Sequence, residues 1–314
     1  MTDWVHAIVQ IFVSGVWEEA ICRVASIHTW GDMMLKRLLL PREATAWRKL
    51  HFTKCIETFK KRIKDRECNH KDLIYFVLKN KEARQNLSEK GLMLNVILLI
   101  SAGGETTAST LTVRTYFVCT NPKVYKRLID EIRGKFKATD DMIWEAVQPE
   151  HLPYLHATIQ EALRLIPPPA ASQQRIVPPG GPTICGEFIP GGYHVAVPPF
   201  VTHFDTNFKD PLEFRPERRP SREDPDWDDR FANDVLGASQ PFSLGPRVCL
   251  GRTVASFEMR LILTNIVWHF DMTLANPQET MNQWTTEDDM KHFKGYLTWI
   301  RPPLEIRLQE AKHE

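Results

Sequence analysis

The sequence lacks the cysteine patterns of a zinc site or a disulfide framework. Its 314 residues contain six cysteines, scattered singly, with no Cys-x-x-Cys pair and no Cys/His cluster at zinc spacing. An excess of charge is also absent, because 40 basic and 39 acidic residues leave a formal net charge of +1. A balanced charge gives no reason to expect nucleic acid as a partner. These absences argue against a structural zinc protein, a disulfide-rich domain and a nucleic-acid-binding protein.

The amino-terminal segment lacks the patterns of a signal peptide and of a membrane anchor. It has no basic start, and the apolar run at residues 5–16 is too short to span a bilayer before Trp17-Glu18-Glu19 interrupts it. We therefore expect no transmembrane anchor in this chain.

What is present is an ordinary globular composition with 43% hydrophobic and 25% charged residues, enough for a large core. No stretch is typical of a linker, so we expect a single domain over residues 1–314. Helical periodicity dominates, and the predicted fold class is mainly α with a small β region. Helices are expected within residues 4–81, at 88–119, 122–136 and 151–166, and from 249 onward; short strands at 172–199; a long loop at 205–246; and a terminal hairpin from 296–300 and 304–308.

The helix expected at residues 88–119 is unusual. Ser88 is a plausible cap, and residues 92–100 are almost continuously apolar, which predicts a buried helix. The run Ala-Gly-Gly-Glu-Thr-Thr at 102–107 interrupts it with two glycines, each of which weakens a helix by about 1 kcal/mol. Two helix-weakening glycines in a buried helix indicate a functional role for this turn; the alternative is a simple irregularity of packing.

The strongest motif lies directly before the last expected helix. Residues 242–251 read Phe-Ser-Leu-Gly-Pro-Arg-Val-Cys-Leu-Gly. A cysteine at a helix start gains thiolate character, the form that binds iron, although a lone cysteine is more often a buried small hydrophobe. Gly245 and Gly251 would let the backbone pass close to a flat macrocycle. Arg247 is placed to pair with a carboxylate such as a haem propionate.

This stretch matches every fixed position of Phe-x-x-Gly-x-Arg-x-Cys-x-Gly, the haem-binding signature of the cytochromes P450, from Phe242 to Gly251. The chain therefore resembles a cytochrome P450. The resemblance implies the carboxy-terminal portion of the P450 fold, with residues 1–87 as roof and flanking helices and 88–314 as the haem-binding core. It also implies haem (heme b) as the cofactor, with Cys249 as the metal ligand.

A second family motif, Glu-x-x-Arg, appears at Glu161 and Arg164, where the spacing puts acid and base on one helical face. By itself it is also compatible with a surface ion pair. The family adds an arginine from a Pro-Glu-Arg loop, here Arg218, so the resemblance implies a structural triad of Glu161, Arg164 and Arg218. Arg219 stands where many relatives have an aromatic residue, which leaves the packing of this loop open; a surface arginine is the simpler interpretation.

The resemblance gives the interrupted helix a function. Residues 102–107 look like the family's oxygen-binding motif, with Thr106 as a hydrogen-bonding catalytic residue and Glu105 linking it to water for proton delivery. Arg175 matches a position that often meets a haem propionate. His203 is expected either near the same edge or as a satisfied structural histidine.

The texture of the chain is closest to filamentous-fungal P450s that tailor secondary metabolites, such as isotrichodermin 15-hydroxylase-like enzymes. This implies a monooxygenase that oxidises a lipophilic small molecule with O2 and with NADPH-derived electrons from NADPH-cytochrome P450 reductase. The family is longer, so we expect the chain to start partway through it; the alternative is a truncated, catalytically silent fragment that cannot retain haem. A reductase-independent or peroxide-using relative is a further alternative. The expected location is the endoplasmic reticulum membrane surface, or the cytoplasm without an anchor.

Overall fold

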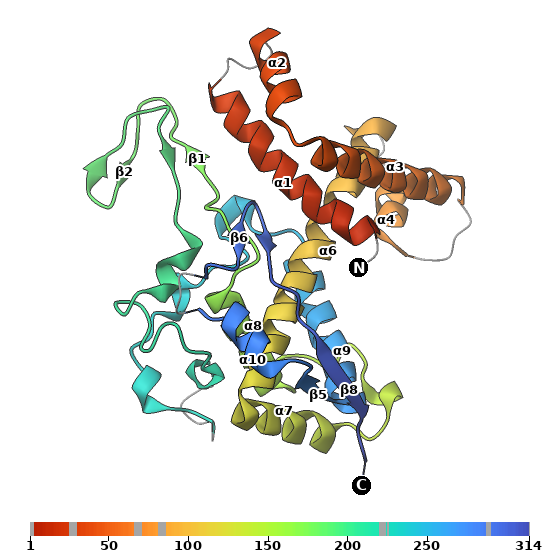
Figure 1. Cartoon of the computed structure of the whole chain (residues 1–314), viewed down its shortest axis with the longest axis vertical. Coiled ribbons are helices and arrows are strands. Elements are labelled where there is room, and N and C mark those ends of the chain that lie inside the picture. The colour runs from red at the N-terminus through yellow and green to blue at the C-terminus, as the bar shows by residue number, and fades with distance from the viewer. Residues whose placement is uncertain are drawn as a thin grey trace. The chain divides into compact units, whose positions relative to one another are not determined.

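The computed structural model describes residues 3–24, 30–65, 71–80, 86–219, 224, 226–286 and 290–313. The chain divides into two compact units, residues 1–105 and 106–314, and the boundary falls inside the long helix α6 (Glu89–Thr120). Figure 1 labels the elements of both units. The expected single domain, with its division at residue 88, stays a prediction.

The first unit is helical, as the amphipathic pattern predicts. It consists of α1 (Asp3–Val24), α2 (Trp30–Leu39), α3 (Arg42–Lys64), α4 (Leu73–Lys79) and the first part of α6. Helix α1 packs along α3. The start of α6 is capped as expected, because the hydroxyl of Ser88 accepts the N–H of Gly91 at 3.1 Å.

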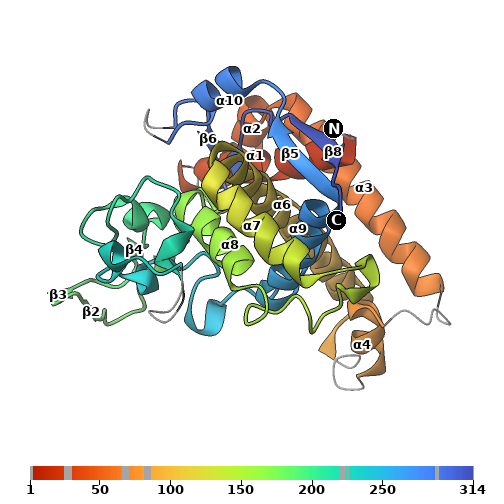
Figure 2. The same cartoon turned by 90° about the horizontal axis from the view of Figure 1, so that it is seen from below.

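The second unit holds the main core. Its helices are the rest of α6, α7 (Pro122–Lys135), α8 (Pro153–Leu165), α9 (Arg252–His269) and α10 (Pro277–Gln283). Helices α7, α8 and α9 contact one another, and Figure 2 shows α7 lying across α8 and α9. Helix α8 is buried on nearly every side, so it is the centre of the unit; its buried apolar members include Leu155, Ile159, Ala162 and Leu165.

The strands form four separate antiparallel pairs in the described residues: β1 (Arg175–Ile176) with β4 (His194–Val195), β2 (Thr183–Ile184) with β3 (Glu187–Phe188), β5 (Phe270–Leu274) with β8 (Ile306–Glu310), and β6 (Lys294–Gly295) with β7 (Trp299–Ile300). The predicted terminal hairpin is wrong. The last strand pairs with β5 after α9, with Met272 opposite Leu308, while Trp299 pairs back to Gly295. This arrangement puts Met272 and Trp299 in the core.

The segment at 205–246 is a long loop, as predicted. Its described part contains short 3-10 turns, η3 (Pro216–Arg218), η4 (Asp229–Phe231) and η5 (Leu236–Ala238), and a further turn, η6 (Gly245–Arg247), lies just before Cys249. The loop is tied to the core by buried side chains, among them Phe214 and Phe231.

Helix α6 is buried on one side only in its first turns, so the prediction of a helix buried all round is wrong there. Leu92 and Ile97 are 8% and 5% exposed, whereas Leu94 and Leu98 are 48% and 63% exposed. Only one side of these turns is covered. Among the described helices, α6 alone is long and apolar enough to cross a membrane. Its second half, however, contributes side chains to the core of the second unit.

Candidate functional site

Cys249 lies in a closed loop that ends at the first turn of α9. Its backbone N–H donates to the carbonyl oxygen of Phe242 at 2.8 Å, which joins the two ends of the loop, and its own carbonyl accepts the N–H of Arg252 at 3.2 Å. Gly245 has a φ of +68°, in the left-handed region that glycine adopts with little strain. The backbone thus places the cysteine in the loop directly before α9.

The side chains around Cys249 are apolar and exposed. Leu244, Val248 and Leu250 expose 65%, 43% and 88% of their surface, and Cys249 itself is exposed. A flat and mostly apolar macrocycle with a central iron requires such surroundings: apolar side chains to cover and a thiol within reach. The loop therefore fits a haem whose iron Cys249 would hold as a thiolate.

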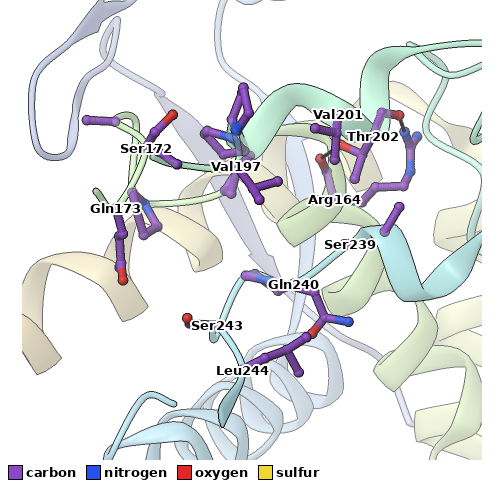
Figure 3. Close-up of a pocket in the computed structure, with 18 of the residues that line it drawn as sticks. Arg164, Ser172, Gln173, Val197, Val201, Thr202, Ser239, Gln240, Ser243 and Leu244 are labelled. Carbon is purple, nitrogen blue, oxygen red and sulfur yellow. Dashed lines mark hydrogen bonds between the residues drawn. The ribbon is translucent and has the colours of Figure 1, made fainter. Parts of the chain in front are cut away.

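A cavity of about 450 Å³ lies beside this loop in the second unit. Figure 3 shows Ser172 and Gln173 on one side of it and Ser243 and Leu244 on the other. Arg175 also lines the cavity, so the structure brings this residue and the start of the cysteine loop to one place. Most of the wall is apolar, with contributions such as Pro167, Pro169, Val195, Val197 and Val201.

The two arginines predicted to bind haem propionates, Arg175 and Arg247, are both exposed. The Nη1 group of Arg175 donates to the backbone carbonyls of Gln174 at 3.0 Å and Gln173 at 3.4 Å. A guanidinium at the surface is able to bind a carboxylate in bidentate geometry. The exposure is compatible with the predicted role, which stays a prediction.

The buried ion cluster expected from the Glu-x-x-Arg motif is present. Arg164 donates from Nε and Nη2 to the two carboxylate oxygens of Glu161 at 3.0 and 2.7 Å, and Arg218 donates from Nε to Glu161 Oε1 at 3.0 Å. All three side chains are fully buried. A buried carboxylate is tolerated only when it is paired, so the two arginines allow Glu161 to lie in the core.

The cluster includes groups that sequence reasoning missed. Asp234 accepts from Nη1 of Arg218 at 2.6 Å, and its side chain is 3% exposed. No motif marks Asp234, which lies in the long loop among other acidic residues. The remaining N–H groups of Arg164 donate to backbone carbonyls of that region, those of Thr202, Pro211 and Glu213 at 3.1, 2.5 and 3.0 Å.

Arg219 belongs to the same cluster, and the prediction of a surface arginine is wrong. Its side chain is 14% exposed, and its Nε lies 3.9 Å from Glu161 Oε2. Burial lowers the pKa of its guanidinium, an effect that the Glu161 carboxylate partly opposes. Its Nε and Nη2 form no hydrogen bond within the described part of the chain. Residue 219 therefore places a third guanidinium near one carboxylate.

The residues predicted to form the oxygen-binding motif, 102–107, lie on α6, and the boundary between the two units falls between Glu105 and Thr106. Glu105, the last residue of the first unit, is 4% exposed, and Thr106, the first residue of the second, is half-buried. A side chain at Gly103 would meet no atom within 4 Å, and one at Gly104 would make an ordinary contact with Ile8. Neither glycine is needed for packing of the described residues, which is compatible with a functional reason for both.

His203 is a structural histidine, the second of the two expectations for it. Its Nε2 lies 2.8 Å from the carbonyl oxygen of Leu165, to which it donates, and its ring packs on Phe200. Burial lowers the pKa of His203, so the ring is neutral in the folded protein. It helps to join the 3-10 turn at 199–203 to the end of α8.

A lone cysteine in an exposed apolar loop before α9, together with a buried carboxylate and arginine cluster, is the arrangement expected of a haem-thiolate protein. A model of the family described as "Cytochrome P450" matches residues 21–295, and the chain belongs to the cytochrome P450 family. A crystal structure of a cytochrome P450, CYP102L1, has the same fold, with a TM-score of 0.67 over 86% of this chain and 57% of that one, at 24% sequence identity.

Fungal cytochrome P450 monooxygenases are among the similar proteins, which confirms the expected resemblance to filamentous-fungal P450s. The cytochrome P450 monooxygenase abl2 of Leptosphaeria maculans is 63% identical over all of this chain and 57% of its own length. The cytochrome P450 monooxygenase aba2 of Botryotinia fuckeliana is 49% identical over 99% of this chain and 58% of its own length. ABA2 of Pyricularia oryzae strain Y34 is 40% identical, and the chain covers 73% of it. The chain thus spans a little over half the length of the first two relatives.

Proposed function

We propose that this protein is a haem-thiolate monooxygenase. It inserts one oxygen atom of O2 into a lipophilic small molecule, a fungal secondary-metabolite intermediate, with electrons that pass from NADPH through NADPH-cytochrome P450 reductase. The single observation that carries the proposal is the exposed Cys249 in its closed, apolar loop at the start of α9. The relatives whose names describe them as cytochrome P450 monooxygenases support it.

Each predicted site residue has a defined part in this proposal. Bound haem supplies reductive activation of O2, and Cys249 would hold its iron as a thiolate. Arg175 and Arg247 would bind the propionates through their guanidinium groups. Glu105 and Thr106 would hold and pass the proton that the reaction consumes.

The carbon monoxide difference spectrum of the reduced protein tests the proposal. The chain is expressed with haem supply, and a Soret band at the position typical of thiolate ligation is the expected result. Cys249→Ala should abolish this band. Cys185→Ala is the matched control, because Cys185 is also an exposed free cysteine, located after β2 and outside the motif at residues 242–251.

Two outcomes would count against the proposal. If the chain takes up no haem, the alternative of a catalytically silent chain is correct. If the band persists in Cys249→Ala, the ligand assignment is wrong.

Cell fractionation tests the proposed location at the endoplasmic reticulum membrane: the protein should sediment with the microsomes, and recovery in the soluble fraction would favour the cytoplasm.

A further inference from the structure

A buried histidine connects three helices of the first unit. His51 of α3 is 0% exposed. The indole N–H of Trp4 in α1 donates to its Nδ1 at 3.2 Å, and the hydroxyl oxygen of Ser101 in α6 lies 2.9 Å from its Nε2. The thiol of Cys55, one turn further along α3, lies 3.2 Å from the same Nε2. These contacts lie outside the loop at residues 242–249 that holds Cys249, and the proposed function does not use them.

The chemistry of the side chains decides which atom donates in each hydrogen bond between Trp4, His51 and Ser101. Because the indole of Trp4 can only donate, Nδ1 of His51 must accept. A neutral imidazole then carries its proton on Nε2, which donates to the hydroxyl oxygen of Ser101. The Ser101 hydroxyl in turn donates to the carbonyl oxygen of Ile97 at 2.8 Å. Burial lowers the pKa of His51 and so favours the neutral ring that this order needs.

The histidine contacts α6 at the turn just before the oxygen motif. Ser101 precedes residues 102–107, and Glu105 lies one turn further on the same helical face as Ser101. Both side chains are buried, at 6% and 4% exposure. A serine that bonds back to the carbonyl four residues earlier tends to bend a helix, and the two glycines that follow weaken it further. An external contact at Ser101 therefore acts where glycine gives α6 its lowest helix propensity.

We propose that His51 is a positioning residue: its Nε2–H bond to Ser101 holds the turn of α6 that precedes Glu105. The bond fixes the rotation of this turn and thereby the direction in which Glu105 points. The importance of that direction for proton delivery rests on the proposed function. The bond itself, and the measurement that tests it, do not require haem.

Hydrogen exchange of the full chain, followed by mass spectrometry of peptides that cover residues 98–105, tests the inference. His51→Leu keeps the approximate size of the side chain and removes all three polar contacts of the ring, with Trp4, Ser101 and Cys55, so the exchange rate of these amides should rise about tenfold. His51→Gln retains a donor and an acceptor, and its rates should stay within about twofold of the wild type. Ser101→Ala removes only the acceptor and should raise the rates by about threefold.

His6→Leu is the matched control, because His6 is a half-buried histidine of the same unit whose ring packs on Trp47. It should leave the exchange of residues 98–105 unchanged. Unchanged exchange in His51→Leu, or an equal rise over the whole first unit, would overturn the inference; if that variant does not fold, Ser101→Ala decides. If the wild type gives a normal carbon monoxide spectrum but His51→Leu leaves the exchange unchanged, the positioning role alone is wrong. If the wild type takes up no haem but His51→Leu raises the exchange of residues 98–105, the proposed function alone is wrong.

Discussion

The two most informative regions of the second unit differ in almost every physical respect. In the cluster around Glu161, the side chains of Glu161, Arg164 and Arg218 are fully buried, and Arg164 uses its guanidinium in five hydrogen bonds. The loop around Cys249 is exposed, and its apolar side chains face outward. The cluster joins α8 to the long loop that leads to Cys249. A rigid polar framework thus supports an open reactive loop, a common division between scaffold and site.

Removing the shared carboxylate should give the largest effect. Glu161→Gln leaves Arg164 buried without a counter-charge and leaves Arg218 with Asp234 alone, which should lower the free energy of unfolding by about 3 to 5 kcal/mol. Cys249→Ala, at the exposed loop, should change it by less than about 0.5 kcal/mol. Urea denaturation of both variants measures the contrast. Glu213→Gln is the matched control, since its exposed pair with Arg215 is worth at most about 1 kcal/mol; a similar loss in both glutamate variants would contradict the proposed role of the cluster.

The second-largest effect should be a loss of folding stability at acidic pH, through the half-buried histidine His156. Burial, together with Arg260 and Arg219, lowers the pKa of His156 to about 4. Between its ordinary value and 4 the unfolded chain binds a proton that the folded chain does not, so stability falls as the pH drops through this window. We expect a loss of about 2 kcal/mol between pH 7 and pH 4 from this residue, allowing for its partial exposure.

His156→Gln should remove that part of the slope, because glutamine does not titrate. The check is a series of urea denaturations from pH 7 to pH 4 on both proteins. The stability of the wild type relative to that of the variant should fall by about 2 kcal/mol between pH 7 and pH 4. Parallel curves over the whole range would show that His156 takes no part in the acid sensitivity.

Local sequence patterns predict most helices of this chain and fail where distant residues decide. The periodic segment at 151–166 corresponds to α8, and the motif spacing correctly predicts the contact of Glu161 with Arg164. The terminal hairpin fails because strand β8 finds its partner in β5, far back in the chain. Arg219 fails similarly, since its burial depends on a carboxylate 58 positions earlier, and sequence position alone does not show which arginine reaches it.

Another fully buried arginine, besides Arg164 and Arg218, shows what the hydrogen-bond partners of Arg164 contribute. Arg114 on α6 donates from Nε to the hydroxyl of Thr158 at 3.2 Å, but its Nη1 and Nη2 have no hydrogen-bond partner in the described part of the chain. Burial lowers its pKa to about 10. Arg114→Met should therefore stabilise the protein by about 1 to 2 kcal/mol, whereas Arg164→Met should destabilise it by at least about 3 kcal/mol.

The two variants make the same chemical change at two buried arginines. If their stabilities change in opposite directions, the difference reflects the hydrogen-bond partners that each guanidinium has. Thr158 keeps a hydrogen bond in Arg114→Met because its hydroxyl donates to the carbonyl of Leu155 at 2.7 Å. Thermal unfolding of the two proteins side by side measures the difference. A loss of stability in both would mean that Arg114 is as well accommodated as Arg164.

The smallest effect should come from the backbone of the cysteine loop. Gly245 has a φ of +68°, where a side chain is disfavoured, so Gly245→Ala should cost about 1 kcal/mol. A Cβ there would meet no atom within 4 Å, so the cost reflects conformation and not crowding. Gly251→Ala is the control: its φ is −83°, and the new Cβ would lie 4.0 Å from the Cys249 Sγ, an ordinary contact. Equal stability of the two alanine variants in urea would show that the loop does not depend on the left-handed turn before Cys249.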